Sequence, residues 1–345
     1  MTTTKEIHMI KKILTTLVMI ACAATALAAP VLINGAGATF PYPIYSKWFD
    51  VYSNINKDVQ FNYQSIGSGG GIKQITAKTV DFGASDGPMT DQQLAEAPGR
   101  LFHIPMVMGA VVVAYNVPGI SKGLKLTPEV VAGIFLGHIA KWNDEKIAAA
   151  NPDQKLSDTP IVVVHRSDGS GTTFIFVDYL SSVSGDWKLK TGKGTSVNWP
   201  VGLGGKGNEG VAGLVKQMPG AFGYVELSYA VKNNLAYAFI QNQSGNFIEP
   251  TLESTSKAAE GVTIPSDFRV SLVNSANPDA YPISGFTWLL IYRTMDDAVK
   301  GKAIVDFINW AIHDGQKYTK DLLYAPLPAE VVSMIEKKLT EVKTG

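Results

Sequence analysis

Short apolar runs, often rich in β-branched residues, alternate along this chain with stretches in which apolar residues recur at helical spacing. The pattern predicts strands within 31–33, 59–63, 80–88, 104–116, 161–164, 219–225 and 281–292. It predicts helices over 44–52, from about residue 70, and over 174–180, 211–217, 298–312 and 329–339, with a helical region at 130–135 that resumes at Ile147 after residues 142–144. Repeated strand–turn–helix units are typical of an α/β fold. At 345 residues, the chain is long enough for two domains with separate cores.

The strand at 161–164 runs into a turn that offers several groups to an anion. The turn carries glycines that allow close backbone approach and hydroxyl donors, in the order Gly169, Ser170, Gly171 and Thr172. The free N–H groups at the start of the next helix would point at the same place. Arg166 adds a planar cation that matches two oxyanion oxygens, and Asp168 could hold that guanidinium. Taken alone, the turn fits equally well as a capped strand-to-helix turn with an exposed arginine.

Two earlier turns of the same kind favour the anion interpretation. The first follows the opening strand and carries more glycine than a helix cap needs. Its Thr39 is predicted as the N-cap, Pro41 in the first helical turn, and Phe40 as the wall of a dry pocket. The second, at 66–71, has four glycines around Ser68, which leaves backbone N–H groups bare. It lacks the Gly-Lys-Ser/Thr ending of a P-loop, which argues against a nucleoside triphosphate.

Asp86 ends a short strand, at the edge where open α/β sheets bind ligands. A carboxylate beside an anion is useful if the ligand carries a proton. It then accepts that hydrogen bond and repels an anion of equal size that has no proton. An ordinary Asx turn before Gly87 and Pro88 is the alternative, and the residue pattern alone favours it.

The first 28 residues have the pattern of a secretory leader. Two lysines precede a short apolar run, and residues 26–28 form an Ala-x-Ala cleavage signal. We therefore expect export to the periplasm of a diderm bacterium. Lipid attachment at Cys22, the single cysteine, is a weaker alternative, and Met9 is an alternative start to Met1.

Charge and motifs exclude several other classes. Lys plus Arg and Asp plus Glu number 30 each, so the net charge predicts no nucleic-acid partner, and any anion site must be local. Ser170 lacks the G-x-S-x-G frame of serine hydrolases, and the histidines show no zinc-ligand spacing.

The glycine-rich segment at 198–210 could line a cleft, although a hinge or packing role is the simpler expectation. The polar stretch at 241–268 is expected to be an irregular surface excursion.

Five segments match one known family in their order and spacing: Gly35–Pro41, Ile66–Gly70, Asp81–Asp86, Arg166–Thr172 and Gly202–Asn208. They resemble the periplasmic phosphate-binding proteins of bacterial high-affinity phosphate ABC transporters. The resemblance covers nearly the whole chain after the leader. Gly69 departs from members that have serine there, and Ser167 lies where the family varies.

This resemblance implies a two-lobed α/β periplasmic binding protein of type II, with discontinuous domains joined by crossover strands and the ligand in the cleft between them. Domain I would comprise 30–105 and 283–345, and domain II would comprise 106–282. The implied function is high-affinity binding of inorganic phosphate and its delivery to the membrane permease of an ABC importer. No catalysis, cofactor or metal is implied, and a monomer is expected.

The resemblance also implies which residues hold the phosphate. They are Thr39, Phe40, Ser68, Asp86, Arg166, Ser170, Gly171 and Thr172, with Asp168 paired to Arg166. Asp86 would accept the proton of the phosphate, and Arg166 would be the one cationic ligand. Two rivals stay open. One is a binding protein for sulfate or another fully ionised oxyanion, against which Asp86 argues, and the other is a surface phosphate-binding protein in adhesion or sensing.

Overall fold

The computed structural model describes residues 29–345, and the predicted leader at 1–28 lies outside the described residues. The strands are β1 (Val31–Gly37), β2 (Val59–Ser65), β3 (Phe82–Ser85), β4 (Leu101–Tyr115), β5 (Lys125–Leu126), β6 (Val162–Arg166), β7 (Leu203–Gly205), β8 (Ala221–Glu226), β9 (Ala236–Tyr237), β10 (Phe239–Gln241), β11 (Phe247–Ile248), β12 (Ser284–Tyr292), β13 (Thr294–Met295) and β14 (Lys343–Thr344). The α-helices are α2 (Tyr42–Ile55), α3 (Ser68–Thr76), α4 (Asp91–Glu96), α5 (Pro128–Phe135), α6 (Glu145–Ala150), α7 (Gly171–Val183), α8 (Gly185–Lys190), α9 (Gly207–Gln217), α10 (Leu227–Lys232), α11 (Leu252–Lys257), α12 (Ala298–Ile312) and α13 (Ala329–Leu339). Two short 3-10 helices, η1 (Asp314–Tyr318) and η2 (Lys320–Leu322), lie between the last two α-helices.

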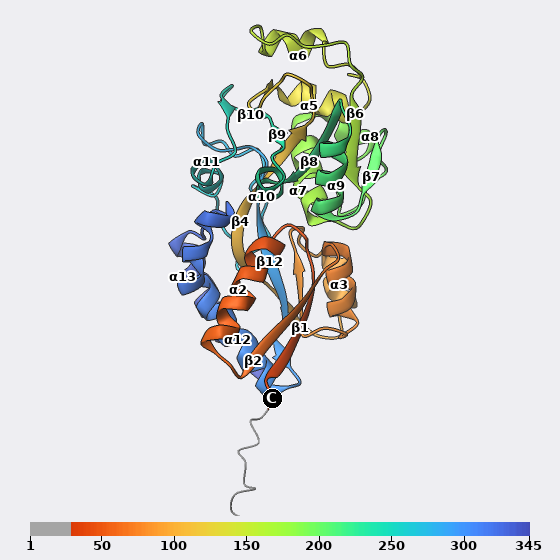
Figure 1. Cartoon of the computed structure of the whole chain (residues 1–345). Helices are drawn as coiled ribbons and strands as arrows, with labels where there is room; N and C mark the ends of the chain where they lie inside the picture. The colour runs from red at the N-terminus through yellow and green to blue at the C-terminus, as the bar shows by residue number, and fades with distance from the viewer. Residues whose placement is uncertain (1–28) are drawn as a thin grey trace, which may run out of the picture.

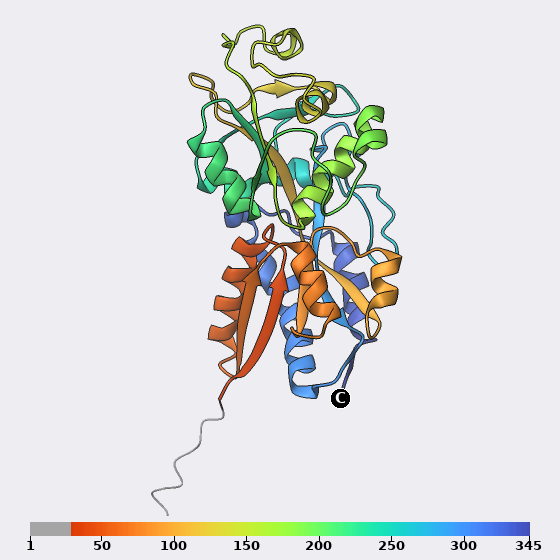
Figure 2. The ribbon, with the colours of Figure 1, turned by 90° about the vertical axis from the view of Figure 1, so that its right-hand side faces the viewer.

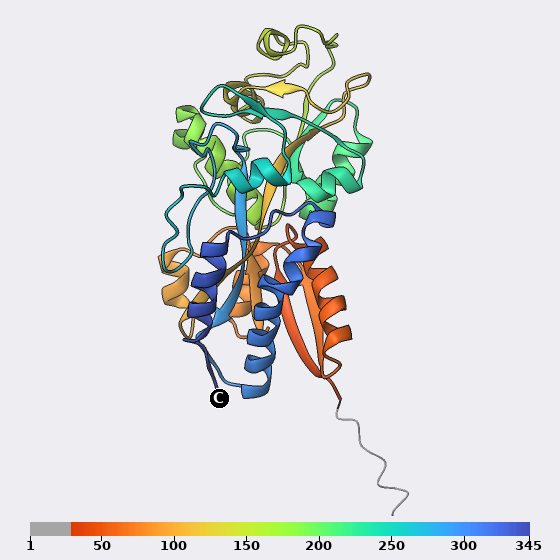
Figure 3. The ribbon, with the colours of Figure 1, turned by 90° about the vertical axis from the view of Figure 1, so that its left-hand side faces the viewer.

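The main sheet runs through two lobes in the order β2-β1-β3-β12-β4-β8-β6-β7. Strand β4 belongs to both, since it pairs with β12 from Leu101 to Ala110 and with β8 from Val111 to Tyr115. We call the part built on β2, β1, β3 and β12 lobe I, and the part built on β8, β6 and β7 lobe II. Figure 1 shows the lobes stacked, with the beginning and the end of the described chain both in the lower one, lobe I. Figures 2 and 3 show the same division from the two sides.

Each lobe presents the carboxyl ends of parallel strands to the other lobe. In lobe I, β1 pairs in parallel with β2 and β3, so the turns after these three strands leave the sheet at one edge. In lobe II, β6 pairs in parallel with β7 and β8 in the same way. The glycine turns singled out in the sequence therefore end up facing one another across the lobe interface.

The helices at the end of the chain have the predicted bounds, 298–312 and 329–339, and the long apolar strands β4 and β12 lie where apolar runs predict them. The prediction of Thr39 as an N-cap is wrong. Helix α2 begins three residues later, with Pro41 in the cap position and no side-chain cap. The carbonyl and hydroxyl oxygens of Thr39 are instead engaged by lobe II, which keeps the chain irregular there.

Two other expectations also need correction. Helices α7 and α9 begin at Gly171 and Gly207, earlier than predicted, because their first residues are polar or glycine and an apolar pattern does not mark them. The stretch 241–268 is not wholly irregular, since it contains β11 and α11.

Aromatic residues fill the centre of each lobe. Phe49, Phe61 and Phe307 pack together in lobe I, with ring centroids 4.6 to 5.2 Å apart. In lobe II, Phe176 stacks on Tyr224 at 4.4 Å. Burial of such rings contributes several kcal/mol per lobe, on the order of 2 kcal/mol for each side chain, and gives rigid supports for the turns above them. Among the described residues, we find no helix with the length and apolarity needed to cross a membrane.

Candidate anion-binding site

The eight residues predicted as ligands meet at the interface between the lobes. Four come from lobe I and four from lobe II, and all are buried. They are Thr39, Phe40, Ser68 and Asp86 on one side, and Arg166, Ser170, Gly171 and Thr172 on the other.

Arg166 is the cation of the lobe II side, at the end of β6. Its Nε donates to Asp168 Oδ1 at 2.8 Å, and its Nη2 donates to the second carboxylate oxygen, so the predicted ion pair is confirmed. Burial raises the pKa of Asp168, but the two hydrogen bonds and the charge of Arg166 outweigh it and hold that pKa below its usual value. The backbone N–H of Gly207 also donates to Asp168. The guanidinium is therefore locked in one orientation.

The turn after Arg166 leads directly into helix α7. Ser170 is the N-cap, and its Oγ accepts from the N–H of Thr173 at 3.0 Å. The N–H of Gly171 crosses the interface to Ser68 Oγ, also at 3.0 Å. A Cβ on Gly171 would lie 2.5 Å from the backbone nitrogen of Asp86, closer than real Cβ contacts allow. A glycine is therefore required for the lobes to approach this closely.

Asp86 is the one carboxylate among the eight residues, and its side chain is 1% exposed. Its Oδ1 accepts from Thr287 Oγ1 at 2.8 Å, and its backbone N–H donates to Ser68 Oγ at 3.2 Å. Burial raises the pKa of Asp86 to about 7, although Thr287, Arg166 and Ser68 each act to lower it. The ionised carboxylate is thus short of donors and favours a partner that brings a proton.

Ser68 and Thr39 use their hydroxyl oxygens as acceptors. Ser68 Oγ accepts two backbone N–H groups, from Asp86 and from Gly171. Thr39 Oγ1 accepts from the side-chain amide of Asn208 at 2.7 Å and from its backbone N–H at 3.2 Å. Since a hydroxyl has two lone pairs and one hydrogen, both groups keep their hydrogen for a further acceptor.

Three backbone N–H groups at the interface, those of Phe40, Ser68 and Thr172, make no hydrogen bond to another group among residues 29–345. All three residues are buried, with 0% of their surface exposed. Buried N–H groups without a partner are rare in folded proteins because each costs free energy. Together with the two hydroxyls and Arg166, they form a set of donors suited to an oxyanion.

Several residues that hold these groups in place were not predicted from the sequence. Asn208 lies in the glycine-rich segment that was expected to serve as a hinge or in packing, but it bridges Thr39 and Thr172. Tyr229 and Tyr324 donate to the carbonyls of the Thr39–Phe40 turn, each at 2.6 Å. Only the position of Asn208 in a glycine-rich turn could have drawn attention to it.

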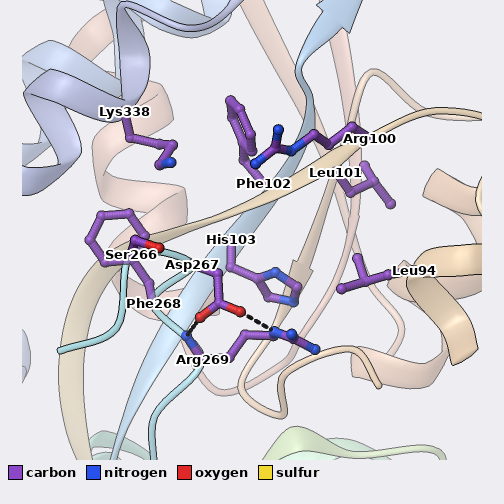
Figure 4. Close-up of a pocket in the computed structure, with 10 residues that line it drawn as sticks. All are labelled: Leu94, Arg100, Leu101, Phe102, His103, Ser266, Asp267, Phe268, Arg269 and Lys338. Atoms are coloured by element: carbon purple, nitrogen blue, oxygen red, sulfur yellow. Dashed lines mark hydrogen bonds and ion pairs between the residues drawn. The ribbon is translucent and has the colours of Figure 1, made fainter. Parts of the chain in front are cut away.

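Another pocket, of about 250 Å³, lies between lobe I and the segment that contains Arg269 (Figure 4). It contains cations, but Arg269 pairs with Asp91 at 2.7 Å and with Asp267 at 2.8 Å, which offsets its charge. His103 Nε2 accepts from the N–H of Met89, and burial lowers the pKa of His103 to about 4. These groups hold the fold together, and the anion site remains the interface between the lobes.

Comparison with known proteins agrees with this geometry. A family model described as "PBP superfamily domain" matches residues 24–314. The chain is 48% identical over 309 residues to the "Phosphate-binding protein PstS" of Xylella fastidiosa. This alignment covers 89% of this chain and 84% of the relative. It is 47% identical to the PstS protein of Haemophilus influenzae, over 90% of this chain and 93% of the relative. The chain belongs to the PstS family of phosphate-binding proteins.

Solved structures support the fold. An ABC-type phosphate transport receptor from Vibrio cholerae aligns with a TM-score of 0.57 at 18% identity, over 86% of this chain and all of that one. The predicted two-lobed α/β binding-protein fold is thereby confirmed, and membership of the PstS family confirms a binding protein rather than an enzyme.

Proposed function

We propose that this PstS family member binds inorganic phosphate between its lobes and delivers it to the membrane permease of an ABC importer. The observation that carries the proposal is the meeting of buried donors from both lobes around one carboxylate, Asp86. The phosphate oxygens would be bound by three kinds of donor: the guanidinium of Arg166, the free N–H groups, and the hydroxyls of Thr39, Ser68, Ser170 and Thr172. Their convergence in a buried site favours tight binding without an excess of cations.

Asp86 gives the site its selectivity in this proposal. An ionised Asp86 accepts the hydrogen of a protonated phosphate and repels sulfate, which has no hydrogen to donate. The burial that raises the pKa of Asp86 to about 7 supports this role. The ionised carboxylate accepts a hydrogen bond from Thr287, and a further hydrogen bond from the ligand would stabilise its buried charge. Neither a sulfate-binding protein nor a general oxyanion binder would be expected to keep a carboxylate at this position.

Delivery depends on closure of the lobes in this proposal. The two predicted domains would swing about the crossover strands that join them. Domain I comprises 30–105 and 283–345, and domain II comprises 106–282. Phosphate favours the closed form because its ligands lie on both sides. The change of partner of β4 between Ala110 and Val111 supports a hinge at this place. We further propose that the protein acts as a monomer in the periplasm, where a permease could receive its closed form.

Calorimetric titration of the leaderless protein, freed of ligand by partial unfolding, tests the proposal. Phosphate and then sulfate are titrated from pH 5 to 8.5. Micromolar or tighter phosphate binding with little sulfate binding at pH 8 is expected. Comparable sulfate binding at that pH would remove the role of Asp86, and no heat with either anion would overturn phosphate binding.

A further inference from the structure

A second carboxyl group, that of Glu226, is buried at the lobe interface and lies outside the predicted ligand set. Glu226 is the last residue of β8 and the N-cap of α10, and its side chain accepts from the N–H of Ser228 at 2.9 Å. None of its surface is exposed. Its Oε1 has no hydrogen-bond partner among the described residues. An ionised carboxylate in this place would be costly, because burial penalises a charge that is not fully paired.

Glu226 touches lobe I through Tyr324. The Tyr324 hydroxyl lies 2.6 Å from the carbonyl oxygen of Phe40 and 3.2 Å from Glu226 Oε2. A carbonyl can only accept, so the single hydroxyl hydrogen of Tyr324 goes to Phe40. With that hydrogen committed to Phe40, the tyrosine oxygen and Oε2 form a hydrogen bond only when the carboxyl itself carries a hydrogen. The contact is satisfied when Glu226 is a neutral acid.

Within residues 29–345, no cation pairs with Glu226 to keep it ionised, and Arg166, which acts on the neighbouring Tyr229 and Asp86, is paired with Asp168. The titratable groups that face it are the phenols of Tyr324 and Tyr229 and the carboxyl of Asp86. From α9, Asn208 accepts the backbone N–H of Glu226, and from β4 the paired residue is Val111. Among the described residues, no Lys, Arg or His forms an ion pair with it. The closed interface therefore favours the protonated form.

We propose that Glu226 is a positioning residue of the anion site that takes up a proton when the lobes close, so that phosphate binding is coupled to proton uptake at the interface. The protonated carboxyl holds Tyr324, and Tyr324 holds the carbonyl of Phe40, which fixes the residue whose own N–H, in the preceding peptide group, would face the anion. This inference rests on the proposed binding of phosphate. It adds a proton that belongs to the protein and not to the ligand.

The pH range follows from the pKa of the closed and open forms. Burial raises the pKa of Glu226 to about 8, while the hydrogen bonds from Ser228 act to lower it. An open form that exposes the side chain would have the ordinary value of about 4. Between these values the open form is ionised and the closed form is neutral, so closure takes up a proton and weakens as the pH rises. The coupling fades as the pH falls below about 4 or rises through about 8, and it is gone by about pH 9.

The test is calorimetric titration of phosphate at pH 6 in buffers of different ionisation enthalpy, which counts the protons taken up. Wild type is compared with Glu226→Gln, whose amide is neutral and can donate to Tyr324. The matched control is Glu209→Gln, because Glu209 also contacts a tyrosine hydroxyl of this site, at 3.2 Å, but lies at the exposed surface. We expect wild type and the control to take up close to one proton more per phosphate than Glu226→Gln. The difference should vanish above about pH 9.

Equal proton counts in wild type and Glu226→Gln would overturn the inference while leaving phosphate binding intact. Absence of phosphate binding in wild type would instead overturn the proposed function. If Glu226→Gln does not fold, as judged by circular dichroism, the infrared difference spectrum of wild type with and without phosphate at pH 7.5 decides whether a carboxyl takes up a proton. Phosphate binding must then add the C=O band of a protonated carboxyl, and no such band would reject the proton uptake.

Discussion

The two faces of the anion site are built in different ways. The lobe II face comes from one continuous turn, in which Arg166, its partner Asp168 and the start of α7 lie within seven residues. The lobe I face is assembled from the ends of three strands, with Thr287 of β12 behind Asp86. The cation is paired on its own lobe, whereas the hydrogen-bond partners of the Asp86 side chain are neutral. The lobe II face is thus organised by itself, and the charge on the lobe I face depends on closure.

This difference explains why burial has opposite outcomes for the pKa values of Asp168 and Asp86. Asp168 has a local cation that outweighs the cost of burial, so its pKa falls. The charge of Arg166 acts on Asp86 only across the interface, so the effect of burial dominates and the pKa of Asp86 rises to about 7. The arginine turn would supply binding strength, and the aspartate would supply selectivity.

Loss of Arg166 tests the lobe II face and should have the largest effect. Arg166→Ala removes at least two charge-assisted hydrogen bonds of roughly 1.5 to 3 kcal/mol each. Phosphate affinity measured by calorimetry should fall at least about 100-fold. Arg100→Ala, which removes an exposed arginine over Phe102, is the control and should bind like wild type. A loss of less than about tenfold would show that Arg166 is not a ligand.

Gly171→Ala tests the contact between the two faces. The added methyl would lie 2.5 Å from the nitrogen and 2.6 Å from the Oδ2 of Asp86, so the closed form must open slightly. Overpacking of this kind costs about 1 to 3 kcal/mol, which predicts phosphate binding weakened by about 10-fold to 100-fold. Gly213→Ala on α9 is the control, because the methyl added there would meet no atom within 4 Å beyond its chain neighbours and the nearby backbone of its own helix. Equal affinity in the two variants would contradict the close approach.

Asp86→Asn tests the lobe I face. The amide can donate to sulfate and no longer repels it, so sulfate should bind at all pH values and phosphate affinity should fall about tenfold. In wild type, sulfate binding should emerge only as the pH falls below about 7, because protonation turns Asp86 from an acceptor into a donor. Titration of sulfate from pH 5 to 8.5 measures both. Sulfate binding by wild type that does not change with pH would refute this account of selectivity.

Thr287→Val should give the smallest effect. It removes the hydroxyl that donates to Asp86 at 2.8 Å and stabilises its ionised form. A lost hydrogen bond of about 1 kcal/mol should raise the pKa of Asp86 by somewhat less than one unit. The pH at which sulfate binding emerges should rise by the same amount. Thr340→Val at an exposed position serves as the control, and an unchanged pH profile in Thr287→Val would rule out a role in tuning Asp86.

Features that depend on neighbouring residues could be predicted from the sequence. The closing helices have their predicted bounds because apolar spacing along one helix decides which face is buried. The pair of Arg166 and Asp168 was predictable because the two residues lie two positions apart in one turn. The resemblance to phosphate-binding proteins rests on the same local motifs, and the comparisons confirm it.

Features that depend on the meeting of the lobes were decided by the tertiary structure. Thr39 failed as a helix cap because Asn208 and Tyr229, far along the chain, take its hydroxyl and carbonyl oxygens. The partners of Glu226 and Asp86 also lie far from them in sequence, at 98 positions for Tyr324 and 201 for Thr287. No local pattern encodes such pairs, and the burial that raises the pKa of both carboxyls exists only where the two lobes meet.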